Sequence, residues 1–274
     1  MNQNLEIICV GNELLIGKTL NTNANWLAKR VTNLGLNTTR ITVVSDNITE
    51  ISTAIKEAIN RKPSFVLTTG GLGPTFDDKT LEGLAEALGT TTETNPQALQ
   101  MVKEKYQSYA KERKTGDIEL TAARVKMANI PKGAEPLANP VGTAPAVVAK
   151  DCNVTVFALP GVPSEMKAIF DNSVAPVLRE ASCGVSFFET SIETVNVMES
   201  EMAPCVDTVM QNNPYVYIKS HPKGEERLPL IEFHLSTTAE NVDVAKKRVT
   251  TALVQLTELV KQKGGKIKPI ESMK

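Results

Sequence analysis

The stretch TTGGLGPTFDDKT, residues 68–80, holds three glycines, one proline and two adjacent aspartates. It directly follows the apolar run FVL at residues 65–67, which is typical of a buried strand. Residues 79–88 then show helical spacing, and Gly89 follows as a stop signal. A strand that leads into a helix through a glycine-rich turn is the building unit of an open parallel sheet. The stretch therefore predicts an α/β fold and raises the question of what its turn binds.

Short apolar runs alternate with amphipathic segments in the sequence before this turn. The runs have the length of strands, and the segments between them place apolar residues at helical spacing. We expect an α/β sandwich of three layers, in which helices cover both faces of a mostly parallel sheet. The expected elements are strands 5–10, 38–44 and 64–69 and helices 23–34, 50–60 and 79–88.

The pattern continues to about residue 181, where the composition changes and a second domain is predicted. Before this point we expect helices from Pro96 to Lys111, at 119–128 and at 163–179, and strands at 146–149 and 154–159. After it, the order strand 187–197, helix 199–211, strands 215–220 and 229–236 and helix 239–262 indicates a small α+β unit of the type β-α-β-β-α. The sequence thus predicts domains at 1–180 and 181–265, followed by a frayed tail at 266–274.

The bulk composition excludes several classes of partner. The 274 residues include 30 basic and 31 acidic side chains, so the chain has no electrostatic footprint for nucleic acid or for an anionic membrane. Its four cysteines are scattered, and no apolar run has the length of a membrane span. The N-terminus lacks the features of a signal peptide. A reduced, cytoplasmic, soluble protein is expected.

The turn after the third strand has the features of a phosphate site. Gly70, Gly71 and Gly73 allow the backbone to approach an anion, so that amide N–H groups can converge on phosphate oxygens beside a helix N-terminus. Asp77 and Asp78 would repel a phosphate, and two explanations remain open. One aspartate could cap the following helix, or both could hold a divalent cation, most simply Mg²⁺, that bridges to the phosphate.

Two more turns should converge on the same edge of the sheet, because ligands bind beyond the carboxyl ends of parallel strands. Glu13, Asn21 and Asn23 follow the first strand, and Asp46 follows the second. The asparagines could equally cap the helix that carries Trp26, and Asp46 could cap the helix expected at 50–60. The segment GNELLIGKT ends like a P-loop, but five residues separate its first two glycines where a P-loop has four.

Two late segments are candidates for a pocket wall. ANPVGTAPAV, at 138–147, supplies Asn139, Gly142 and Thr143, and ALPGVPSEM, at 158–166, supplies a second turn. Proline beside glycine holds a backbone in one shape, which suits a pocket wall, although either segment alone could be a plain loop. The candidates from the second turn are Pro160, Gly161 and Glu165.

Taken together, these segments resemble the molybdenum-cofactor-biosynthesis domain family (MoaB/Mog-like), and more closely the N-terminal part of CinA-type proteins. The matching stretches are GNELLIGKTLNTNANWLA, VVSDN, TTGGLGPTFDDKT, NPVGTAP and ALPGVPSEMKAIF, in family order. Residues 185–263 resemble the small KH-like domain that follows in CinA-type proteins. The C-terminal amidase domain has no counterpart here, so amidase activity on nicotinamide nucleotides is not expected. RNA binding is not expected either, because SHPKGEERLP lacks the GxxG loop of a KH domain that binds RNA.

The resemblance implies a Mog-like sandwich that binds a nucleotide or a pterin, and it assigns roles to individual residues. Asn12 stands where the family often has aspartate, so no charged metal ligand is expected there. In the resemblance, Gly70, Gly71 and Gly73 cradle phosphate, Asp78 and Thr80 form an Asp-x-Thr pair, Asp77 is the doubled aspartate of the CinA branch, Asp46 is an acidic site position, and Pro160, Gly161 and Glu165 belong to a late pocket motif.

Three functions remain open at this point. The first is metal-dependent hydrolysis of ADP-ribose or a similar nucleoside diphosphate compound, with Asp46, Asp77 and Asp78 as catalytic residues and Asp77 and Asp78 as metal ligands. The second is adenylyl transfer to molybdopterin at the same site. The third is nucleotide binding without catalysis. A homo-oligomer is expected in each case, since family members self-associate.

Overall fold

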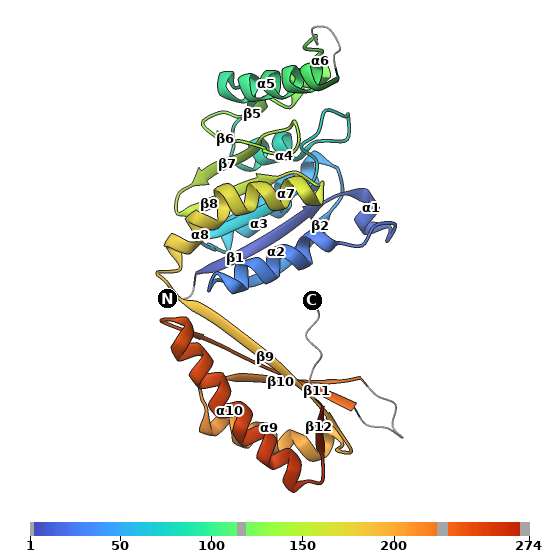
Figure 1. The fold of residues 1–274 in the computed structure, drawn as a ribbon. Helices are drawn as coiled ribbons and strands as arrows, with labels where there is room; N and C mark the ends of the chain where they lie inside the picture. The colour runs from blue at the N-terminus through green and yellow to red at the C-terminus, as the bar shows by residue number, and fades with distance from the viewer. Residues whose placement is uncertain (1–2, 114–118, 224–229, 269–274) are drawn as a thin grey trace. The chain divides into compact units, whose positions relative to one another are not determined.

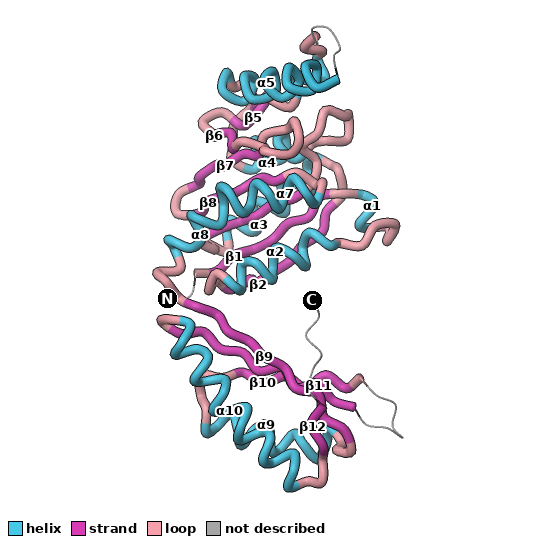
Figure 2. Tube along the Cα trace, viewed as in Figure 1, coloured by secondary structure: helices cyan, strands magenta, loops and turns pink. Residues whose placement is uncertain are grey.

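The computed structural model describes residues 3–113, 119–223 and 230–268 (Figure 1; Figure 2). These residues form two compact units. One lies within residues 1–182, and the other comprises residues 33–35 and the described part of 183–274. In the described residues, no helix is both long and apolar enough to cross a membrane.

The first unit is built on a six-stranded sheet in the order β2-β1-β3-β8-β7-β6. The first four of these strands are parallel, whereas β7 and β6 run antiparallel to their neighbours. The mostly parallel sheet predicted from the sequence is confirmed, and β6 is an addition to it. The strands are β1 (Asn4–Val10), β2 (Asn37–Val44), β3 (Phe65–Thr69), β6 (Glu135–Leu137), β7 (Ala146–Asp151) and β8 (Val154–Leu159).

Helices cover both faces of this sheet, as the three-layer prediction requires. Because side chains alternate along a strand, Ile8 and Val10 of β1 pack with Ile51 of α3 (Ile48–Asn60) and Leu84 of α4 (Thr80–Ala87). Helix α2 (Thr22–Asn33) lies with α7 (Pro163–Ile169) and α8 (Ala175–Ala181) in front of the sheet in Figure 1, and α3 lies behind it. The short helix α1 (Asn12–Leu15) follows β1 directly and was not predicted.

A subdomain follows α4. Its main element is α5 (Pro96–Arg113), which begins after Asn95, whose side chain accepts from the amides of Gln97 and Ala98. The helix predicted at 119–128 is shorter, at α6 (Ala122–Lys126). The strands β4 (Thr92–Thr94) and β5 (Asn129–Pro131) pair antiparallel, and neither was predicted.

The helix predicted at 163–179 is interrupted near Pro176. It consists of α7 (Pro163–Ile169), a π-helical turn η1 (Phe170–Val174) and α8 (Ala175–Ala181). Proline lacks an amide N–H and its ring crowds the preceding turn, so a regular α-helix cannot pass through it unchanged. Trp26 of α2 packs edge-on against Phe170, with ring centroids 5.3 Å apart, and this contact holds α2 to the interrupted helix.

The second unit contains an antiparallel sheet in the order β10-β11-β9-β12, with two helices on one face. The predicted β-α-β-β-α order is present. The tail was predicted to be frayed from residue 266, but residues 266–268 form a strand that pairs with β9; residues 269–274 lie outside the described part. The elements are β9 (Ser186–Val195), α9 (Glu199–Asn212), β10 (Tyr217–Pro222), β11 (Leu230–Ala239), α10 (Val242–Gln262) and β12 (Lys266–Lys268).

Candidate functional site

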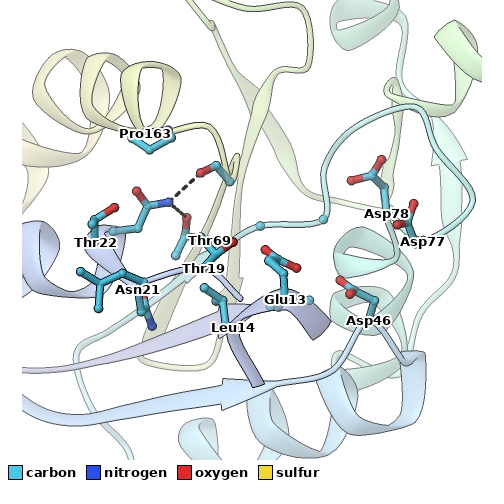
Figure 3. A pocket seen from close by; sticks show the side chains of 17 residues that line it. Glu13, Leu14, Thr19, Asn21, Thr22, Asp46, Thr69, Asp77, Asp78 and Pro163 are labelled. Carbon is cyan, nitrogen blue, oxygen red and sulfur yellow. Dashed lines mark hydrogen bonds between the residues drawn. The ribbon is translucent and has the colours of Figure 1, made fainter. Parts of the chain in front are cut away.

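A cavity of about 310 Å³ lies at the carboxyl edge of the parallel strands, where the turns after β1, β2, β3 and β8 meet (Figure 3). It contains nine of the residues predicted from the sequence. They come from four separate turns, and the structure brings these turns together at one cavity. The nine are Glu13, Asn21, Asn23, Asp46, Gly70, Gly71, Asp77, Asp78 and Gly161.

Gly70 and Gly71 give the turn after β3 its shape. Both have positive φ angles, 110° at Gly70 and 65° at Gly71, a region that side chains strongly disfavour. A Cβ atom at Gly70 would collide with the carbonyl oxygen of Val10, and one at Gly71 would collide with the hydroxyl of Thr80. The absence of side chains therefore allows this turn to lie directly against the end of β1 and the start of α4.

Fewer glycine amides are available to a phosphate than the three that the sequence suggested. The Gly70 N–H donates to the carbonyl oxygen of Leu159 at 3.0 Å, so it is not free for a ligand. Gly73 lies outside the main cavity and lines a neighbouring one of about 30 Å³. Among the described hydrogen bonds, none uses the N–H of Gly71, which does line the main cavity. Gly71 is thus the glycine whose amide can meet an anion there.

Two hydrogen bonds of Thr80 fix the start of α4 to the same turn. Thr80 is buried, its hydroxyl donates to the carbonyl oxygen of Gly70 at 2.7 Å, and its N–H donates to that of Gly71 at 3.1 Å. Thr80 therefore holds the turn in place from below and does not line the main cavity.

Asp77 and Asp78 do not cap α4, so this explanation of the paired aspartates is wrong. The cap position is Lys79, and it makes no side-chain cap hydrogen bond. Instead, Oδ2 of Asp78 accepts from the N–H of Thr75 at 2.8 Å, and the Thr75 hydroxyl lies within hydrogen-bond reach of both carboxylates. Lys126 donates to the Thr75 carbonyl oxygen and anchors the loop from the other side. Neither Thr75 nor Lys126 was a candidate from the sequence.

The pKa of Asp77 is lowered from its ordinary value, so this carboxylate stays ionised well into the acid range. The largest cause is the hydrogen bond from the Thr75 hydroxyl, followed by the backbone N–H of Asp77 itself and the positive charges of Lys126 and Lys79. Hydrogen bonds and cations near a carboxylate favour its charged form. Asp77 therefore presents a stable negative charge to the cavity.

Asp46 does not cap the helix that follows it, so the capping interpretation is wrong here as well. Asn47 caps α3, because its side chain accepts from the amides of Thr49 and Glu50. Asp46 points instead to the cavity, where one oxygen accepts from the N–H of Asn12 at 2.8 Å. Figure 3 shows the carboxylates of Glu13 and Asp46 on the same side of the cavity as Asp77 and Asp78.

The two asparagines after β1 have different roles. Asn21 caps α2, since its side-chain oxygen accepts from the N–H of Ala24 at 3.0 Å, and it also lines the cavity. Asn23 makes long-range contacts: its amide nitrogen donates to the Gly161 carbonyl oxygen at 2.8 Å and to the Thr69 hydroxyl at 3.1 Å. Asn23 thereby joins the turns after β1, β3 and β8, a role that capping alone would not have indicated.

The remaining predicted site residues lie elsewhere. Asn139 is buried, donates to Glu165 at 2.7 Å and accepts from the amides of Val141 and Gly142. Its side chain, with that of Thr143, lines a separate cavity of about 300 Å³ beside α5. Pro160 contributes a carbonyl oxygen to the Thr69 hydroxyl. In the described structure, Asn139, Gly142, Thr143, Pro160 and Glu165 do not line the main cavity.

The charge distribution in the cavity is one-sided. Four carboxylates line it, and none of the described residues that line it is a lysine or an arginine. In the part of the chain that the structure describes, no three histidine, cysteine, aspartate or glutamate side chains are grouped closely enough to hold a metal ion by themselves. Mg²⁺ in nucleotide sites usually takes only one or two protein carboxylates, with phosphate oxygens and water as its other ligands. The residues present fit this second arrangement.

Comparisons with known proteins agree with this architecture. Residues 6–180 match the family model described as "Probable molybdopterin binding domain". A protein of Sulfurisphaera tokodaii is 44% identical over 263 residues, which cover 96% of this chain and 97% of the relative. Protein PAE0875 of Pyrobaculum aerophilum is 45% identical over 262 residues, which cover 94% of this chain and 95% of the relative.

One solved structure is similar in both sequence and fold. It is the crystal structure of the protein CinA, with unknown function, from Thermoplasma acidophilum, and it is 39% identical with a TM-score of 0.58. The similarity covers 64% of this chain and 98% of that chain.

Proposed function

The chain belongs to the molybdenum-cofactor-biosynthesis domain family, and from this premise we propose that its cavity hydrolyses the diphosphate of ADP-ribose or a similar nucleoside diphosphate compound with the help of Mg²⁺. The turns after four strands bring the unpaired amide of Gly71 and four carboxylates to a single cavity. In an open α/β sheet, this edge is where nucleotides bind.

The main support for the proposal is that the charged side chains among the described lining residues are all carboxylates. A diphosphate that entered alone would face four carboxylates without a basic side chain among the described lining residues. The Coulomb energy of such an arrangement is unfavourable at short distance. A divalent cation that accompanies the diphosphate removes this repulsion, so the donor set favours a metal–diphosphate complex over the free anion.

Asp77 and Asp78 are the residues that would hold the cation, because they flank the glycine turn and Asp77 is kept ionised. When bound, the cation supplies charge neutralisation on the phosphate oxygens and lowers the pKa of an attacking water. Asp78 keeps Oδ1 for this purpose, since Oδ2 is engaged by Thr75.

Other residues of the chain bind and orient the reactants in this proposal. The Gly71 N–H donates to a phosphate oxygen, and the carboxylate of Glu13 or of Asp46 accepts the proton that the attacking water loses. The water oxygen forms a bond to one phosphorus while the bridging P–O bond breaks, and ADP-ribose yields AMP and ribose 5-phosphate. Carboxylates are the available bases, because both histidines of the chain lie on the strands of the second unit.

The test is an assay of the purified full chain with ADP-ribose, with and without Mg²⁺, in which AMP and ribose 5-phosphate are quantified. We expect turnover that requires Mg²⁺ and falls by about 100-fold or more in Asp78→Asn, since removal of one charge-stabilising group at a reacting phosphate has an effect of this order. Asp207→Asn, an exposed aspartate of α9, is the matched control and should retain full activity. Unchanged turnover in Asp78→Asn would disprove the mechanism.

The family description favours a second candidate, adenylyl transfer to molybdopterin at the same cavity. Its metal requirement would be similar, but the acceptor would be the pterin phosphate in place of water. Incubation with ATP, molybdopterin and Mg²⁺ would then release pyrophosphate, whereas ADP-ribose would remain intact. Binding of both nucleotides without turnover of either under any divalent cation would indicate a non-catalytic module.

A further inference from the structure

One end of the cavity carries no charge. Figure 3 shows Asn21, Thr22 and Pro163 at the end opposite the aspartates. The uncharged residues that line the cavity include Leu14, Thr19, Leu20, Asn21, Thr22, Asn23, Thr69 and Pro163. Apolar surfaces combined with a few fixed polar groups are typical of sites that bind small organic ligands, among them heterocycles.

Asn23 contributes an unusual group to this end. Its amide nitrogen has two acceptors, the Gly161 carbonyl oxygen and the Thr69 hydroxyl. A carbonyl oxygen can only accept, so this contact fixes which end of the Asn23 amide is nitrogen and which is oxygen. The orientation of the side chain is therefore determined by its neighbours.

The oxygen of the same amide has no partner. Oδ1 of Asn23 is shielded from water and makes no hydrogen bond in the described structure. Most buried polar atoms in folded proteins are paired, so an orphaned acceptor in a cavity wall requires an explanation. Asn23 lines the cavity, so a hydrogen-bond donor on a ligand is the explanation that the location of this residue supports.

We propose that Oδ1 of Asn23 accepts a hydrogen bond from the exocyclic amino group of a heterocycle at the uncharged end of the cavity, and that Asn23 thereby selects the ligand. The inference rests on the proposed function, in which the diphosphate occupies the acidic end. Adenine and pterin both carry such an amino group. A site built to pair with an amino group discriminates against analogues that lack it, because its own acceptor is then left buried and unpaired.

The experiment compares ligand pairs by calorimetric titration of the full chain in Mg²⁺. The first pair is ADP-ribose and its analogue with unsubstituted purine, and the second is pterin and lumazine, in which oxygen replaces the amino group. Each pair is measured on the wild type, on Asn23→Ala and on the control Asn33→Ala, an exposed asparagine at the end of the same helix. Inorganic pyrophosphate with Mg²⁺ is titrated in parallel to report on the acidic end alone.

We expect the wild type and the control to bind one amino-bearing ligand roughly five- to tenfold more tightly than its partner, and Asn23→Ala to bind both members of that pair equally. The pair that shows the difference identifies the heterocycle as adenine or pterin. Pyrophosphate binding should be the same in all three proteins.

Two results would overturn the inference while the proposed function stands. One is equal binding of both members of each pair by the wild type, which needs no variant. The other is an equal loss of all ligands, pyrophosphate included, in Asn23→Ala, since it would show that Asn23 only holds the loops together. Absence of Mg²⁺-dependent binding of pyrophosphate and of ADP-ribose to the wild type would instead overturn the proposed function and this inference with it.

Discussion

At the scale of single residues, the site depends on positions where a side chain is absent. Gly70 lies at a φ of 110° with its α-carbon beside the end of β1, and a methyl group there would meet a backbone carbonyl that cannot move aside. Gly89 also has a positive φ, 67°, but nothing lies within 4 Å of the place its Cβ would take. Alanine substitutions at the two glycines therefore distinguish the free-energy cost of the backbone conformation from that of a steric collision.

We predict that Gly70→Ala lowers the free energy of unfolding of the first unit by about 3 kcal/mol, because both costs apply. Gly89→Ala should cost about 1 kcal/mol, because only the conformational cost applies. Urea denaturation followed by fluorescence of Trp26 measures both, since this only tryptophan of the chain lies in the first unit. Equal losses in the two variants would show that the turn after β3 relaxes around an added methyl group.

The acid behaviour of Asp77 is a second prediction at this scale. Its pKa is lowered chiefly by the Thr75 hydroxyl, so Thr75→Val should raise it toward the ordinary aspartate value of about 3.9. Because a depressed pKa stabilises the fold above the ordinary value and the gain is lost as the pH falls through the depressed one, the wild type should be more stable than the variant at neutral pH, and this difference should disappear in strong acid. NMR titration of the Asp77 carboxyl carbon measures the shift. Thr251→Val, on the exposed face of α10, is the control and should leave the titration of Asp77 unchanged.

At the scale of helices and strands, the sequence was informative where an element had to be buried. Strands such as β1 and β3 are mostly apolar because both of their faces are covered, and α3 was recognisable from its apolar face. The elements that were missed are four residues long or shorter: α1, β4, β5, β6 and β12. Such segments are too short for a periodic pattern, and their conformation is decided by pairing with a neighbour.

The candidate site was predictable to a similar degree. Turns after parallel strands must meet at one edge, so Glu13, Asp46 and the glycine turn could be brought together without coordinates. The contact of Lys126 with Thr75 could not, because a backbone carbonyl accepts it across 51 residues of sequence and no residue type marks such a contact. Asn139 and Glu165 were assigned to the site on motif alone, and the structure pairs them with each other.

One contact between elements gives a stability prediction. Arg61, just after α3, donates two hydrogen bonds of 2.8 Å to Glu6 of β1, whose side chain is only 4% exposed. Arg61→Met should lower the free energy of unfolding by roughly 2–4 kcal/mol, because it leaves a buried carboxylate without its partner. The double variant Glu6→Gln, Arg61→Met removes the buried charge as well and should recover part of this loss. Both are measured by the same tryptophan fluorescence, and a double variant no more stable than Arg61→Met would contradict the argument.

At the scale of the whole molecule, the cavity can be assigned to one of the two units. Every described residue that lines the main cavity falls between Val10 and Pro163, within the first unit. The second unit has its own core, built on Phe233, Val249 and Leu256 among others.

We therefore predict that residues 1–182, expressed alone, fold and bind ADP-ribose with Mg²⁺ within about threefold of the affinity of the full chain, since domains with their own cores can fold independently. Circular dichroism verifies that the fragment is folded, and calorimetric titration measures the affinity. Inorganic pyrophosphate is the second ligand, because it probes the acidic end of the cavity without the heterocycle. A folded fragment that binds pyrophosphate but has lost ADP-ribose would mean that the second unit contributes to recognition of the nucleoside, and a folded fragment that binds neither would mean that it is needed to form the cavity itself.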